Sequence, residues 1–359
     1  MPVSPGVKTA IPYRAHIDGL RGLSIIAMIL YHAKFFGGVG GFTGGFTGVD
    51  IFFVISGFLI TSIIVRDIKA GTFSLAGFWE RRIRRIIPPL FVVMVFVIIG
   101  AYFFILYPAD YHHVGNAVIA QSVFGSNILF MLTDNYFDQN SKYSPLLHTW
   151  TLSLEEQFYL FFPFLILLCI YVWRTWFKDS KYRFSWERIV LAAVCVLGLL
   201  SFLASIWFTN VAPSSGLNLP FVRQGVFWQT SLATAGFYLL PTRAWEIALG
   251  IVLALTAFKI RSKILAEMTS IAGLALIAVA IFFLNDGMPF PGFTALIPTV
   301  GTLLIIAANE DHRTKVGDFL SFPMLVGLGL ISYSLYLWHW PLFAFVDVLT
   351  LFKPTTIDH

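Results

Sequence analysis

The stretch LRGLSIIAMILYHAKFF, Leu20 to Phe36, is an apolar run that carries only a few polar residues, two of them Arg21 and His32. These two residues are eleven positions apart, almost three helical turns, so a helix places both side chains on one face, roughly 16 Å apart along its axis. Ionisable groups inside a membrane are usually functional. We therefore interpret the pair as holding the two ends of one long, anionic ligand. The alternative is that Arg21 reaches the lipid headgroups and His32 lies in the opposite interface.

The composition of the chain is that of a helical membrane protein. Hydrophobic residues make up 57% of its 359 residues and charged residues only 12%, unlike a soluble domain. The apolar residues form continuous runs without alternation, which predicts an all-α transmembrane bundle, residues 1–359 forming one domain. The net charge of +5 gives no sign of nucleic-acid binding. Cys169 and Cys195 lie in apolar runs, so we expect buried thiols and no disulfide or metal site.

Nine runs of about 20 residues, with some tilt and some polar flanks, are long enough to cross a bilayer, and a tenth, 115–132, is ambiguous. Cation-rich segments between spans belong in the cytoplasm, so nine spans place the N-terminus there and both ends of 115–132 outside. We expect 115–132 to lie in the interface or to re-enter, because a tenth span would put residues 174–188 outside. The nine runs are 16–36, 48–66, 86–107, 150–173, 188–209, 241–258, 268–284, 293–308 and 328–350. The cationic segments are 8–21, 66–85, 174–188, 259–263 and 312–315, and the cation-poor segments are 37–47, 107–147, 210–240 and 285–292.

A cluster of arginines, RRIRR at 81–85, precedes Pro88 and Pro89, where we expect the third helix to begin. One interpretation is that these arginines only fix the topology and contact headgroups. The other is that Arg82 and Arg85, three residues apart on one helical face, bind phosphates through their planar guanidinium groups.

Acidic residues open the second and fourth runs. Asp50 follows a glycine-rich stretch, where it can cap the helix or interact with its dipole. Glu155 and Glu156 are adjacent and point about 100° apart on a helix, so at most one of them faces a given cavity. We expect Glu155 to be the partner of His32, which the predicted topology places at the same outer level.

Two further motifs lie in later runs. Arg243 and Glu246 have the i,i+3 spacing of a structural ion pair. The stretch 332–341, SYSLYLWHWP, places hydroxyl groups, aromatic rings and His339 in the last run, and by itself it fits an aromatic belt with a proline kink. Nucleotide-binding, hydrolase and zinc motifs of soluble enzymes are absent from the sequence.

Taken together, these residues resemble the membrane acyltransferase family 3. Six motifs occur in the order of that family, and the match runs from residue 14 to 343. They are HIDGLRG (16–22) with His32 following, GVDIFFVISGF (48–58), FWERRIRRIIP (78–88), WTLSLEEQFY (150–159), RAWE (243–246) and SYSLYLWHWP (332–341).

The resemblance implies a multi-pass enzyme of the bacterial inner membrane that moves an acetyl group from cytoplasmic acetyl-CoA to a hydroxyl group of an extracytoplasmic glycan. Within the family the chain looks most similar to O-acetyltransferases of lipopolysaccharide O-antigen and related polysaccharides. Many of these carry a further helix and an extracytoplasmic SGNH domain, so we expect the chain to be truncated before such parts. The implied partners are acetyl-CoA, the glycan and the lipid bilayer, without nucleic acid or a metal.

On this resemblance we assign roles to individual residues. The catalytic residues would be His32, as general base or acyl acceptor, and Glu155, which would orient it. The phosphates of coenzyme A would bind to Arg21, Arg82 and Arg85, and the substrate-binding residues would be Asp50, Trp150 and His339. One alternative is a transporter that carries acyl groups or the glycan across the membrane without catalysing the transfer. Another is a scaffold for a separate enzyme, in which His32 would be dispensable.

Overall fold

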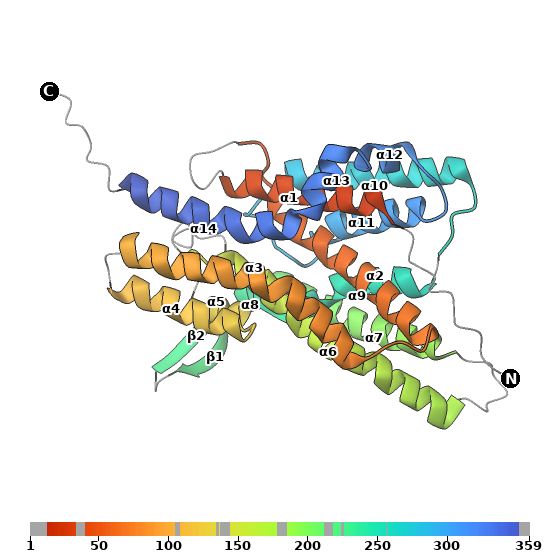
Figure 1. Cartoon of the computed structure of the whole chain (residues 1–359), viewed down its shortest axis with the longest axis horizontal. Helices are drawn as coiled ribbons and strands as arrows, with labels where there is room; N and C mark the ends of the chain where they lie inside the picture. Colours follow the sequence, from red (N-terminus) through yellow and green to blue (C-terminus); the bar gives the residue numbers. More distant parts are fainter. Residues whose placement is uncertain are drawn as a thin grey trace.

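The structure is a computed structural model that describes residues 13–33, 40–104, 108–133, 136, 144–177, 185–211, 218–223, 226–256 and 258–351. These residues form a bundle of helices with one small hairpin (Figure 1). The longer helices fall on the apolar runs, since a helix satisfies its backbone N–H and C=O groups internally, as a bilayer requires. In chain order they are α1 (Ala15–Ala33), α2 (Gly48–Lys69), α3 (Leu75–Phe104), α4 (Pro108–Ser122), α5 (Ser126–Thr133), α6 (Trp150–Val172), α7 (Trp186–Ile206), α8 (Leu232–Tyr238), α9 (Leu240–Thr256), α10 (Lys263–Phe283), α11 (Leu296–Asn309), α12 (Lys315–Leu320), α13 (Pro323–Leu330) and α14 (Ser332–Leu351).

Within the described residues, six helical segments are long and apolar enough to cross a membrane, which makes the chain a multi-pass membrane protein. Three other predicted runs fall on α1, on α11 and on α13 with α14, which are not among the six. The helical bundle is therefore confirmed, and the count of nine spans stays a prediction. The six segments are Gly45–Lys69, Leu75–Phe104, Leu147–Phe177, Trp186–Asn210, Leu232–Thr256 and Lys263–Phe283.

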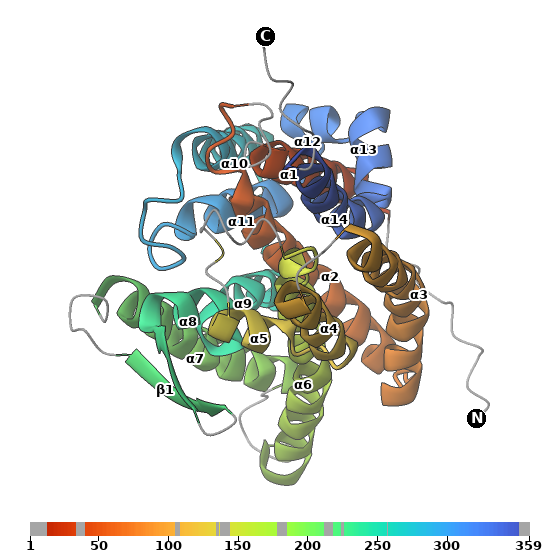
Figure 2. The same cartoon turned by 90° about the vertical axis from the view of Figure 1, so that its left-hand side faces the viewer.

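The expectation of helices alone misses a hairpin. Strands β1 (Asn218–Arg223) and β2 (Val226–Ser231) pair in antiparallel fashion, with Asn218 opposite Ser231. The hairpin lies at one edge of the bundle, where β2 contacts α5 and α8 (Figure 2). The prediction for the cysteines is correct for Cys169, which is buried, and wrong for Cys195, which is exposed on α7.

The third helix begins earlier than predicted. Helix α3 starts at Leu75 and continues through Pro88 and Pro89, so the arginine cluster lies within a helix and not in a loop before it. A proline lacks an N–H and its ring crowds the carbonyl group four residues earlier, but the helix continues from Leu75 to Phe104 with both prolines inside it. The arginine side chains therefore project from a regular helix, and Arg82 and Arg85 share one face as predicted.

The ambiguous run 115–132 is not one helix. It is divided between α4 and α5, which are 15 and 8 residues long, and both are shorter than the roughly 20 residues that cross a bilayer. The break lies at Phe124, whose φ of 52° is in the left-handed region, and this turns the chain back between the two helices. The segment remains a predicted interfacial or re-entrant element.

Helices α2 and α9 approach each other so closely that only glycine fits at their crossing. A Cβ added to Gly57 would lie 2.1 Å from the backbone oxygen of Ile247, and one added to Gly250 would lie 2.0 Å from that of Val54. Small residues that let helix backbones meet are a general means of packing inside membranes. This contact fixes the rotation and depth of α9 against α2, and with them the positions of the ionisable residues on both helices.

We expect Gly250→Ala to destabilise the protein by about 1–3 kcal/mol, since the new methyl group must push the two backbones apart. The measurement is the midpoint of thermal aggregation of the detergent-solubilised protein. Gly115→Ala is the matched control, because a Cβ at Gly115 meets no atom within 4 Å and alanine favours a helix. Equal midpoints for the two variants would contradict the close crossing.

Candidate active site

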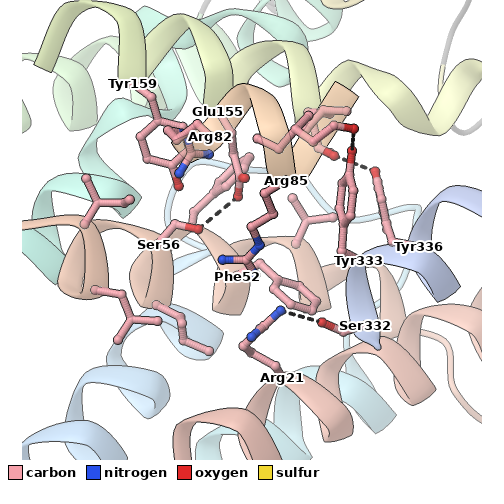
Figure 3. Close-up of a pocket in the computed structure, with 18 of the residues that line it drawn as sticks. Arg21, Phe52, Ser56, Arg82, Arg85, Glu155, Tyr159, Ser332, Tyr333 and Tyr336 are labelled. Carbon is pink, nitrogen blue, oxygen red and sulfur yellow. Dashed lines mark hydrogen bonds between the residues drawn. The ribbon is translucent and has the colours of Figure 1, made fainter. Parts of the chain in front are cut away.

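A cavity between α1, α2, α3, α6 and α14 gathers charged residues that lie far apart in the sequence (Figure 3). Its empty volume is about 1060 Å³, including the open space at its mouth. Arg21 enters it from α1, Arg82 and Arg85 enter from α3, and Glu155 enters from α6. The structure thus brings all three predicted phosphate-binding residues to one cavity. Its other polar groups are the hydroxyl groups of Ser56, Thr151, Tyr159, Ser332, Tyr333 and Tyr336.

Two of the three arginines are held by neighbouring side chains. Arg21 forms an ion pair with Asp18 at 3.0 Å and donates a hydrogen bond to the hydroxyl group of Ser332 at 2.9 Å. The first contact lies within α1 and the second joins α1 to α14. Arg82 pairs with Glu156 at 2.6 Å. Each pairing compensates one positive charge and fixes the direction of the guanidinium group.

The third arginine is the cation with a free guanidinium group. Arg85 makes no ion pair or hydrogen bond with any residue that the structure describes, and it extends into the space between Arg21 and Glu155 (Figure 3). Arg82, by contrast, makes a cation–π contact in addition to its ion pair, because its guanidinium group lies 3.6 Å from the centroid of the Tyr159 ring. Arg85 is therefore the group in the cavity best placed to receive an anion.

The two adjacent carboxylates of α6 have separate surroundings, as their angular separation predicts. Glu156 pairs with Arg82, while Glu155 faces the cavity and accepts a hydrogen bond from the hydroxyl group of Ser56 at 3.2 Å. The predicted contact between Glu155 and His32 is wrong. Glu155 lies more than a turn inside α6, about 7.5 Å from its first residue along the axis, whereas His32 belongs to the ring cluster at the start of that helix.

His32 is 1% exposed and lies in a cluster of rings. Its Nδ1 is 2.9 Å from Nε2 of His339, and its Nε2 is 2.6 Å from the hydroxyl group of Tyr136. The two imidazole rings are stacked, with centroids 5.1 Å apart and planes inclined by 12°, and the indole of Trp340 meets His32 edge-on at 4.8 Å. His339, predicted to bind substrate, is therefore a partner of His32.

The backbone determines which nitrogen of His32 is basic. His339 Nδ1 lies 2.7 Å from the carbonyl oxygen of Tyr336, and a carbonyl only accepts, so this nitrogen carries a hydrogen. In the neutral ring the other nitrogen, Nε2, is then an acceptor and receives the Nδ1–H of His32. This leaves Nε2 of His32 as the acceptor for the Tyr136 hydroxyl group. A histidine held in one tautomer by a fixed partner suits general-base chemistry.

Asp50 and Trp150, which were predicted to bind substrate, do not line the cavity. Asp50 is fully buried and pairs with Arg243 at 3.2 Å, and Arg243 pairs with Glu246 at 3.2 Å as its spacing predicts. The cap of α2 is Thr47 and not Asp50. Trp150 is 1% exposed and packs against Phe237, with ring centroids 4.6 Å apart. Both residues support the fold beside the cavity.

The sequence interpretation missed Tyr136 and the cavity role of Ser56. Tyr136 lies in a polar stretch between two apolar runs, where one tyrosine has no distinguishing pattern. Ser56 belongs to the glycine-rich motif and was assigned to helix packing, but its hydroxyl group faces Glu155 across the cavity. A periodicity count for α2 would have placed Ser56 on the face of Phe52, which also lines the cavity.

A family model described as an acyltransferase domain matches residues 14–355. The chain therefore belongs to acyltransferase family 3, and the resemblance noted in the sequence is confirmed. It is 32% identical over 361 residues to the peptidoglycan O-acetyltransferase OatA of Listeria monocytogenes, covering 95% of this chain and 51% of that protein. It is 31% identical over 348 residues to the O-acetyltransferase OatA of Staphylococcus aureus, covering 93% and 51%.

The chain spans about half the length of these curated relatives. No solved structure matches it.

Proposed function

We propose that the protein is a membrane O-acetyltransferase that takes the acetyl group of cytoplasmic acetyl-CoA and esterifies a hydroxyl group of an extracytoplasmic glycan. The observation that carries the proposal is the position of the cavity. Its lining includes Arg21, Arg82 and Arg85, and it also includes Met28, one helical turn before His32. The donor phosphates would bind at the arginines, and the pantetheine arm would extend toward the histidine.

The distribution of cations supports an orientation for this site. Arg82 and Arg85 belong to the cation-rich segment 66–85, which the positive-inside rule assigns to the cytoplasm. We propose that the N-terminus also lies there, that the membrane is the bacterial inner membrane, and that the arginine cavity opens to the cytoplasm. A soluble, phosphate-bearing donor then reaches its site without crossing the bilayer.

The charged residues of the cavity would contribute to donor binding in different ways. Arg85 would contact phosphate first because its guanidinium group is uncommitted, while Arg21 and Arg82 are already oriented by Asp18 and Glu156. Guanidinium groups bind phosphate in a bidentate manner. Glu155 would not orient His32. Instead, it would repel a misplaced phosphate and hold Ser56 along the path of the pantetheine arm.

The chemical step would use the basic Nε2 of His32. This nitrogen would accept a proton as the acceptor hydroxyl group loses its own and the acceptor oxygen attacks the thioester carbonyl carbon. The new O–C bond forms, the C–S bond breaks, and the thiolate of coenzyme A leaves with the proton that His32 received. Direct transfer requires no acetyl-enzyme, so trapping an acetyl group on His32 would contradict this order of events.

The acceptor we propose is a glycan of the cell envelope. The expected O-antigen or lipopolysaccharide acceptor receives no support from the relatives, one of which is named as a peptidoglycan O-acetyltransferase. A cell-wall glycan therefore becomes the first acceptor to test. The residues that select the glycan would lie on the outer side of the protein, so the identity of the glycan does not alter the roles proposed for the arginine cavity.

Binding of coenzyme A to the purified protein tests the donor site. We expect Arg85→Ala to weaken binding about 10-fold or more in titration calorimetry, because a charge-assisted contact to phosphate contributes about 1.5–3 kcal/mol. Arg84→Ala is the matched control, since Arg84 is the adjacent residue of α3, is absent from the cavity lining and pairs with Glu80 at the surface. Absence of coenzyme A binding in the wild type would refute the acetyl-CoA donor and favour a transporter or a scaffold.

A further inference from the structure

A second cavity lies on the other side of His32, and the proposed function has not used it. Its empty volume is about 690 Å³, including open space. The lining combines hydroxyl groups and one carboxylate with aromatic rings, a mixture typical of sites for polar organic ligands. The lining residues are Tyr136, Thr209, Ser231, Ala233, Thr234, Phe237, Tyr238, Asp286, Met288, Pro289 and Phe290.

The two cavities differ in the parts of the chain that form them. Every residue of the second cavity except Thr209 comes from the cation-poor segments 107–147, 210–240 and 285–292, which the positive-inside rule places outside. Among the residues that the structure describes, its lining has no arginine or lysine, whereas that of the first cavity has three arginines. The first cavity thus suits a phosphate-bearing donor, and the second suits a ligand that binds through hydroxyl groups.

Tyr136 connects the second cavity to His32. Tyr136 lines the cavity, and its hydroxyl oxygen is 2.6 Å from Nε2 of His32. The ring is stacked on Phe237, with centroids 4.9 Å apart, so its direction is fixed by packing. His32 therefore lies between the two cavities. Met28, one helical turn before His32 in α1, lines the first cavity, and Tyr136, which contacts His32, lines the second.

We propose that the second cavity binds the carbohydrate acceptor and that Tyr136 relays the proton of its hydroxyl group to His32. The inference rests on the proposed function and names the acceptor side of the same reaction. The acceptor O–H proton passes to the oxygen of Tyr136 as the Tyr136 proton passes to Nε2 of His32, which leaves the tyrosine neutral. The acceptor oxygen attacks the thioester carbon, and the proton on His32 leaves on the sulfur of coenzyme A.

The other lining groups fit a sugar. Asp286 is exposed at the rim, where its carboxylate can accept hydrogen bonds from two adjacent sugar hydroxyl groups. Phe290 supplies an apolar face for the C–H side of a pyranose ring. Ser231 and Thr234, whose hydroxyl groups are 2.8 Å apart at the start of α8, supply further polar contacts.

A labelling experiment tests the side and the ligand of the second cavity without relying on activity. Met288→Cys in a Cys195→Ser background, produced in intact cells, is treated with a membrane-impermeant maleimide, because Met288 is exposed and lines the cavity but has no proposed contact to the sugar. We expect labelling from outside, and protection by tetra-N-acetylchitotetraose but not by coenzyme A. The control is Arg313→Cys, an exposed residue of a cation-rich segment, which should label only after the membrane is permeabilised. Labelling of Met288→Cys only after permeabilisation, or a lack of protection by the sugar, would overturn the proposal.

Tyr136→Phe tests the relay. The substitution keeps the ring stacked on Phe237 and removes only the hydroxyl group, so the protein should fold and bind coenzyme A with unchanged affinity. We expect kcat for acetyl transfer to tetra-N-acetylchitotetraose to fall about 10²-fold or more, with KM for acetyl-CoA unchanged. Wild-type kcat in Tyr136→Phe would exclude the relay. Failure of the donor site instead shows as a loss of coenzyme A binding in the wild type, so the two failures are distinguishable.

Discussion

His32→Ala should abolish acetylation of the cell-envelope glycan while the protein accumulates in the membrane at its normal level. General-base catalysis by a positioned side chain contributes about 10²–10⁴-fold in rate, and this histidine is held by His339 on one nitrogen and Tyr136 on the other. The measurement is the ester-linked acetate released by mild alkali from the glycan of cells that produce each variant. Membrane abundance is determined in parallel by immunoblot.

Two further variants make the result specific. His32→Gln keeps a side chain that can donate to His339 but has no basic nitrogen, so it should be as inactive as His32→Ala. His312→Ala replaces a histidine in the cation-rich loop before α12, where it contacts the backbone of Arg261, and should acetylate normally. Retained acetylation in His32→Ala at normal abundance would remove the proposed base, and the transporter and the scaffold would become the better explanations.

Arg243→Met should be among the most destabilising single substitutions in the chain. Arg243 is 1% exposed and lies between Asp50 and Glu246, which are both fully buried. Removing the cation leaves two buried carboxylates without a compensating charge, and breaking a buried pair in this way costs about 3–5 kcal/mol. We expect a large loss of folded protein, measured as the monodisperse fraction in fluorescence-detected size-exclusion chromatography.

A triple variant separates charge from shape in this prediction. Asp50→Asn and Glu246→Gln, added to Arg243→Met, remove the uncompensated charges but keep the side-chain volumes close to those of the wild type. Replacing all members of a buried ionic cluster is often close to neutral, so the triple variant should recover much of the folded fraction. If it is as unstable as Arg243→Met, the role of Arg243 lies in its packing against the surrounding aromatic rings and not in its charge.

Several features of the fold and the site were predictable because they depend on residues close together in the chain. Continuous apolar runs identified the membrane helices, since the length and hydropathy of a run decide whether it can cross a bilayer. The i,i+3 spacing predicted the ion pair of Arg243 with Glu246. Helical spacing also predicted that Arg82 and Arg85 share a face. Local geometry alone sets these relations.

Other features were mispredicted because the same local sequence is compatible with more than one backbone structure. The two prolines after the arginine cluster were interpreted as a helix start, but α3 contains them. The 210–240 segment was interpreted as a connection, but part of it forms a hairpin. In both cases neighbouring elements select among backbone conformations that the local sequence permits equally.

The sequence by itself determined a helical membrane protein of acyltransferase family 3 and the residue types of its donor site. Only the tertiary structure decided the partners of these residues: Asp50 pairs with Arg243, Glu155 faces Ser56, and His32 contacts His339 and Tyr136. Such contacts depend on how deep each helix lies and how it is rotated against its neighbours. Packing across the whole bundle, as at the glycine crossing of α2 and α9, sets the depth and rotation of each helix. A local sequence pattern therefore does not predict them.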